Sequence, residues 1–100
     1  MNPHKLLKQL QQQQEKFQQE VAALEVEATS GGGMVKVVMD GQNALKSLAI
    51  DPEVVSKDDV AMLQDLIVAA VNQAARKVDE AVAEKTSSLA GSLPKIPGLF

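Results

Sequence analysis

In the sequence SGGGMVKV, residues 30–37, three consecutive glycines precede a run rich in β-branched residues. A glycine-rich loop holds phosphate when a strand precedes it and a Gly-Lys-Ser or Gly-Lys-Thr sequence opens a helix after it. Here Met34 follows the last glycine, and the next residues favour a strand instead of a helix. Since glycine adopts turn conformations at little cost, we expect residues 31–33 to turn the chain between two strands.

Short strands are expected on both sides of this turn and once more beyond it. Along the second strand Val35 and Val37 point to one face and Lys36 to the other. The turn sequence Asp40-Gly41 then separates this strand from a third. The sequence therefore predicts a three-stranded antiparallel β-meander with strands at about 25–30, 34–40 and 44–50.

Two long helices are expected to flank the strands. Residues of about 3–24 carry apolar side chains at alternating spacings of three and four, the pattern of a helix that packs along a seam. Ser56 is placed to cap a second helix at about 57–87, which keeps one apolar stripe. From residue 88 onward serine, glycine and proline predict an extended tail, 88–100. The predicted fold is α+β, with the whole chain, 1–100, as a single domain.

The composition argues against several classes of function. The chain has no cysteine and one histidine, His4, so neither a thiolate site nor a Ser-His-Asp arrangement can be built convincingly. Its apolar runs are far shorter than the roughly 20 residues of a membrane helix, and no apolar signal-like run begins it. We therefore predict a cytoplasmic protein that is not an enzyme, with no cofactor, metal, membrane contact or small-molecule substrate.

Binding is the remaining class of function, and the basic side chains are the candidates for contact with an anionic partner. Lys5 and Lys8 lie three positions apart on the first helix and form a basic run without a nearby acid. The full candidate set is Lys5, Lys8, Lys16, Arg76, Lys77 and Lys85. For the last four the alternative is a solvated charge balanced by a neighbouring acid.

The length of the first helix predicts a second copy of the chain. About 22 residues span roughly 33 Å, which the short strands cannot cover. The apolar positions near the N-terminal end of this helix therefore need a partner, and dimerisation provides one. The expected interface comprises Leu6, Leu7, Leu10, Val35 and Val37.

Several segments together form a recognisable set of motifs: the run 27–37, Gly41, the sequence LAIDP at 48–52, the sequence LQDLIVAAVNQA at 63–74 and the ending PGLF at 97–100. These motifs resemble those of the YbaB/EbfC family of bacterial nucleoid-associated proteins. The resemblance covers nearly the whole chain, including the glutamine-rich first helix.

This resemblance implies a homodimer with projecting helices that binds double-stranded DNA, alters its conformation, and contributes to nucleoid organisation and gene regulation. The net charge of −3 requires that lysines face the DNA while acids lie elsewhere. We expect weak, salt-sensitive binding with little base specificity. The alternative is a protein-interaction module that uses the helical seam or the tail, with incidental DNA contact.

Overall fold

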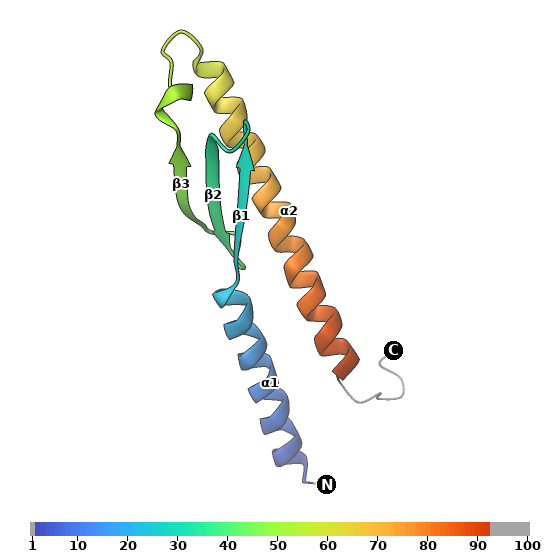
Figure 1. Ribbon diagram of the computed structural model, residues 1–100. Coiled ribbons are helices and arrows are strands. Elements are labelled where there is room, and N and C mark those ends of the chain that lie inside the picture. Colours follow the sequence, from blue (N-terminus) through green and yellow to red (C-terminus); the bar gives the residue numbers. More distant parts are fainter. Residues whose placement is uncertain (1, 93–100) are drawn as a thin grey trace.

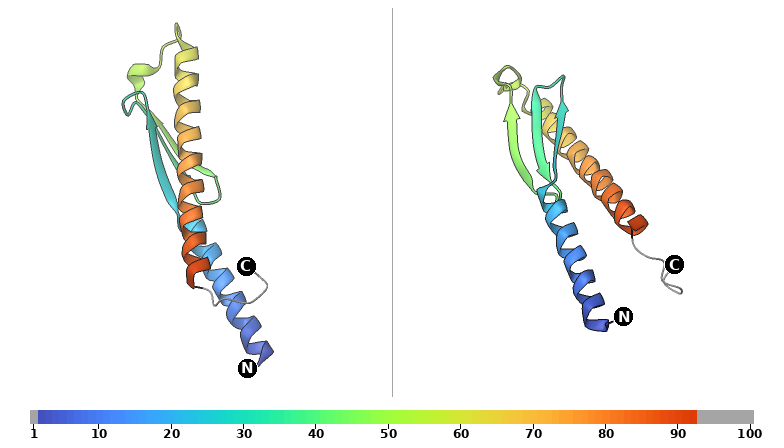
Figure 2. Two further views of the ribbon diagram at one scale, coloured as in Figure 1. Left: turned by 90° about the vertical axis from the view of Figure 1, so that its right-hand side faces the viewer. Right: turned by 60° about the horizontal axis from the view of Figure 1, so that its bottom comes forward.

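The computed structural model describes residues 2–92, and within them it confirms the predicted order of helix, three strands and helix (Figure 1). The elements are α1 (Pro3–Ala23), β1 (Glu25–Ser30), β2 (Val35–Asp40), β3 (Leu45–Ile50), the single 3₁₀ turn η1 (Pro52–Val54) and α2 (Val60–Ser92). The molecule is elongated, with principal extents of 69 × 21 × 16 Å, because both helices run well beyond the sheet (Figure 2).

The glycine run is a hairpin turn, as predicted. Gly31, Gly32 and Gly33 have φ angles of 60°, 68° and 91°, the left-handed region that glycine adopts most easily. Antiparallel pairing of Ser30 with Val35 closes the hairpin between β1 and β2. The hydroxyl of Ser30 also donates to the backbone oxygen of Leu66 at 2.6 Å, which ties the turn to α2.

The core lies between α2 and one face of the sheet. Residues from three elements are buried there, namely Ala28, Val35, Val37, Met39, Ala70, Ala74 and Val78. The two α2 alanines are fully buried, and their small side chains let the helix backbone approach the sheet closely. Beside this core, the Nζ atom of Lys77 on α2 donates to the backbone oxygen of Glu27 on β1 at 2.8 Å.

The third strand extends past the cover that α2 provides. Leu48 pairs with Val37 across the ladder, so both side chains lie on the inner face of the sheet. Val37 is completely buried, whereas Leu48 is 42% exposed and Leu45 is 46% exposed. Figure 1 shows the reason, since α2 runs beside β1 and β3 is the strand farthest from it. The inner face of β3 is therefore an open apolar surface.

Helix α1 is attached to the sheet through its C-terminal end. The N–H of Gly41, in the turn after β2, donates to the backbone oxygen of Leu24 at 3.1 Å. Gly41 itself is buried, and a Cβ atom there would overlap the carbonyl oxygen of Val21. Along α1, Pro3–Ala23, the structure shows no buried residue, so the helix projects from the sheet (Figure 2).

Helix α2 differs from its predicted bounds at both ends. It begins at Val60 because the Asp59 carboxylate accepts the N–H of Met62 at 3.1 Å, which makes Asp59 the N-cap. The expected cap, Ser56, instead accepts the N–H of Asp58 in the preceding turn. At the other end α2 continues to Ser92, so residues 88–92 are helical and not extended. The remainder of the predicted tail, 93–100, lies outside the described residues.

Candidate nucleic-acid interface

The distal half of α1 carries an unbalanced positive charge. Pro3 opens the helix, and the Asn2 side chain caps it by accepting the N–H of His4 at 3.0 Å. From Pro3 to Gln14 the sequence contains Lys5 and Lys8 and no acid. Both lysines are exposed, and neither takes part in any of the three ion pairs found among residues 2–92.

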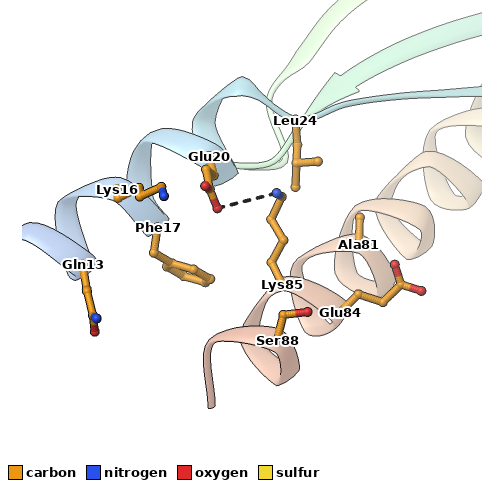
Figure 3. A pocket seen from close by; sticks show the side chains of 9 residues that line it. All are labelled: Gln13, Lys16, Phe17, Glu20, Leu24, Ala81, Glu84, Lys85 and Ser88. Atoms are coloured by element: carbon orange, nitrogen blue, oxygen red, sulfur yellow. Dashed lines mark ion pairs between the residues drawn. The ribbon is translucent and has the colours of Figure 1, made fainter. Parts of the chain in front are cut away.

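The two lysines lie on the side of α1 that faces away from α2. Phe17 of α1 points toward α2 in Figure 3, and Leu6 and Leu10 lie on the same helical face as Phe17 because the spacings are four and seven. At 100° per residue, the midpoint between Lys5 and Lys8 lies about 150° around the helix axis from the centre of this apolar stripe. Their ammonium groups are therefore presented to solvent, where a large anionic partner has access.

Between the two helices lies an open cleft of about 530 Å³ (Figure 3). Its lining residues are Gln13, Lys16, Phe17, Glu20, Leu24, Ala81, Glu84, Lys85 and Ser88. Lys85 is half-buried in it and pairs with Glu20 at 3.8 Å, so part of its charge is already balanced. Lys16 lies at the same cleft on an exposed position of α1.

The six predicted basic residues do not form one patch. Arg76 and Lys77 lie on the part of α2 that packs beside the sheet, far from the free end of α1 (Figure 1). Lys77 is engaged with the backbone of β1, while Arg76 is exposed. The lysines of α1 are consequently the group that the structure leaves most accessible to DNA phosphates.

The residues expected at a dimer interface fall into a buried group and an exposed group. Val35 and Val37 are fully buried beneath α2 within one chain and present no surface to a second. The seam residues of α1 are exposed, with exposed fractions of 43%, 58% and 44% for Leu6, Leu7 and Leu10. Leu45 and Leu48 of β3, which the sequence pattern does not single out, form another open apolar surface.

Over residues 2–92, no three histidine, aspartate or glutamate side chains come together in a way that could hold a metal ion. Among the same residues, neither helix has a segment that is long and apolar enough to cross a membrane.

Comparison with known proteins finds one family model and several relatives that match nearly the whole chain. The model of the YbaB/EbfC DNA-binding family matches residues 1–93. A nucleoid-associated protein of Thermoanaerobacter pseudethanolicus is 50% identical, with 99% of this chain and 91% of the relative covered. A nucleoid-associated protein of Acetivibrio thermocellus is 51% identical, with coverage of 99% and 90%.

A more distant relative and a solved structure extend the comparison. A nucleoid-associated protein of Rhizobium meliloti is 48% identical, with coverage of 93% of this chain and 87% of the relative. The crystal structure of an uncharacterized protein from Helicobacter pylori superposes with a TM-score of 0.75 at 22% identity. The match covers 90% of this chain and 98% of that one, and at this identity it concerns the fold alone.

Proposed function

Because the chain belongs to the YbaB/EbfC DNA-binding family, we propose that it binds duplex DNA as a homodimer with little sequence specificity, through the lysines of α1. The observation that carries the proposal is the acid-free distal half of α1, where Lys5 and Lys8 project away from the rest of the chain. The relatives' name, nucleoid-associated protein, supports a place in the nucleoid. Effects on DNA conformation and gene expression are part of the same proposal.

The charge distribution accounts for DNA binding by a chain whose net charge is −3. Long-range repulsion opposes approach of the whole molecule, but the free end of α1 is locally positive. Lysine contacts to phosphates release condensed counterions and supply affinity that does not depend on sequence. Gln12 and Gln19 lie on the same helical face as the lysines and can donate hydrogen bonds to phosphate oxygens. Such contacts position the protein without reading bases.

The apolar inner face of β3 supports dimerisation through the sheet. Leu45 and Leu48 on the inner face of β3 are more than 40% exposed and need a cover, and in the described chain α2 covers only β1 and β2. A second copy offers the same surface, which a two-fold dimer brings face to face. The dimer then holds two copies of α1 and presents twice the number of lysines to one duplex.

Titration of labelled duplexes of differing sequence at about 50 mM and about 200 mM salt tests the proposal. If Lys5, Lys8 and Lys16 of both chains contact phosphates, about six counterions are released, and affinity falls roughly a thousandfold over this range. Duplexes of differing sequence are expected to bind alike. Affinity that is independent of salt would contradict phosphate contact as the source of binding.

The substitution Leu48→Lys is expected to convert the dimer into a monomer. It places a charge on the inner face of β3, where pairing with a second copy would bury it without a partner. The chain itself should still fold, because Leu48 is already 42% exposed. Light scattering coupled to size-exclusion chromatography measures the change as a halving of the molar mass.

The substitution Leu7→Lys is the matched control for this experiment. Leu7 is 58% exposed on α1, so the same change in charge falls on the helical seam and not on the sheet. We expect the Leu7→Lys protein to remain dimeric. Dissociation caused by Leu7→Lys, with Leu48→Lys still dimeric, would place the interface on α1 and refute the sheet interface.

A further inference from the structure

We propose that Lys85 is a positioning residue, which holds α1 in a fixed direction by pairing with Glu20 across the cleft and does not itself contact DNA. The inference rests on the proposed function, because the direction of α1 decides where Lys5 and Lys8 meet a duplex. The pair joins α2 to α1 at 3.8 Å (Figure 3). Among residues 2–92, it is the one ion pair that links the two helices.

Packing constrains α1 only near its C-terminal end. Across residues 3–23, Phe17 and Val21 are partly buried and every other residue is exposed. The attachment to the sheet is the hydrogen bond from the N–H of Gly41 to the backbone oxygen of Leu24. Because an open cleft of about 530 Å³ separates the helices, side-chain packing there does little to fix the angle between them.

The ion pair supplies the second point of attachment that a fixed direction requires. Glu20 lies about one helical turn before Leu24, and its partner Lys85 comes from a different element than the partner of Leu24. The side chains of Lys85 and Glu20 are 32% and 47% exposed, whereas those of the other two ion pairs are at least 50% exposed. A more shielded pair is screened less by salt.

Small rotations at these two points are amplified at the free end of α1. Lys5 lies roughly 28 Å along the helix from Leu24. A tilt of about 10° therefore moves Lys5 by about 5 Å, which is more than the reach of a hydrogen bond, about 3 Å. Without the pair, the lysines of α1 would occupy a wider range of positions, and ordering them on a duplex would reduce the affinity.

Direct contact with a phosphate is the alternative role for Lys85, and the two roles predict opposite effects of Glu20→Gln. If Lys85 contacts DNA, the substitution frees its ammonium group and removes an acid that repels the duplex, so affinity should rise. If Lys85 positions α1, the same substitution breaks the pair. Affinity should then fall about two- to fivefold, as expected for a partly exposed ion pair.

Duplex titration at low salt compares four full-length variants: Glu20→Gln, Lys85→Gln, both together, and Lys85→Arg. The first three should lose affinity to a similar extent, because the second substitution adds little once the pair is broken. Lys85→Arg keeps the cation and should keep the affinity. The matched control is Glu15→Gln, because Glu15 is an exposed acid of α1 that does not line the cleft. This control should not weaken binding.

A distance measurement without DNA tests the attachment of α1 by itself. Since the chain contains no cysteine, spin labels on Gln9→Cys in α1 and Ala83→Cys in α2 report the separation of the helices. Both positions are exposed, and dilution with unlabelled chain of the same variant isolates distances within one chain. We expect a narrow distribution in the unsubstituted, Lys85→Arg and Glu15→Gln proteins, and a broader one when Glu20 or Lys85 is glutamine.

The two measurements distinguish failure of this proposal from failure of the proposed function. A distribution of unchanged width in Glu20→Gln would overturn the proposal, even if the protein binds DNA. A broader distribution with unchanged or increased affinity would overturn the positioning role. If the unsubstituted protein bound no duplex, the proposed function would fail and the role of the pair in DNA binding with it, while the distances would still decide how α1 is held.

Discussion

The substitution Gly41→Ala is expected to detach α1 from the sheet and to lower the free energy of unfolding by about 2–3 kcal/mol. The added methyl group would overlap the carbonyl oxygen of Val21, and a backbone atom cannot rotate away as a side chain can. The N–H of Gly41 also donates to Leu24 at 3.1 Å, so the clash falls on the contact that holds α1. Urea denaturation at a fixed protein concentration measures the loss.

Gly32→Ala provides the comparison for this prediction. Among residues 2–92, no atom beyond those of Gly32 and its two chain neighbours lies within 4 Å of a Cβ added at Gly32, so the cost there arises from its φ angle of 68°. That cost is about 1–2 kcal/mol and should leave the attachment of α1 intact. Hydrogen exchange over residues 18–24 separates the two effects. Equal protection of this segment in the two variants would show that Gly41 does not anchor the helix.

The order of elements could be predicted from the sequence because local signals agreed with one another. The glycine run favours a turn, the alternation around Val35 favours a strand, and the three-four spacing favours a helix. The start of α2 was predicted less well because several polar residues in a row could serve as its cap. Ser56 and Asp59 both accept backbone N–H groups, and only the structure shows that Asp59 is the one at the helix start.

The surface of β3 could not be predicted from alternation. Leu45 and Leu48 are three residues apart, a spacing that puts side chains on opposite faces of a regular strand. The register between β2 and β3 shifts at Val38 and Met39, so that Leu45 pairs with Met39 and Leu48 pairs with Val37. This irregularity brings both leucines to the inner face.

The burial of Val35 and Val37 within one chain also depends on tertiary structure, so it could not be predicted from the sequence pattern. Periodicity correctly places them on one face of β2, but it does not say whether a helix of the same chain or a second chain covers that face. Helix α2 returns across the sheet and covers them. The exposure of the lysines of α1 could be predicted from the sequence more directly, because a helix that projects from the sheet keeps its charged side chains in solvent.

The double substitution Lys5→Gln and Lys8→Gln is expected to reduce the affinity for duplex DNA at low salt by on the order of a hundredfold or more. In a dimer it removes four positive charges from the free ends of α1. The slope of the logarithm of affinity against the logarithm of salt should decrease in magnitude by about 3.6, because each lost phosphate contact removes about 0.9. Glutamine keeps helix propensity close to that of lysine, so α1 should persist.

Lys36→Gln with Lys46→Gln is the control that separates contact from net charge. It changes the charge of the chain by the same amount, but these lysines lie on the sheet, where they pair with Glu27 at 3.4 Å and Glu25 at 4.0 Å. Salt-screened repulsion over the whole molecule would weaken binding equally in both double variants. Direct contact at the end of α1 predicts that only the Lys5 and Lys8 variant loses the steep salt dependence. An equal loss in the two variants would refute α1 as the DNA-binding element.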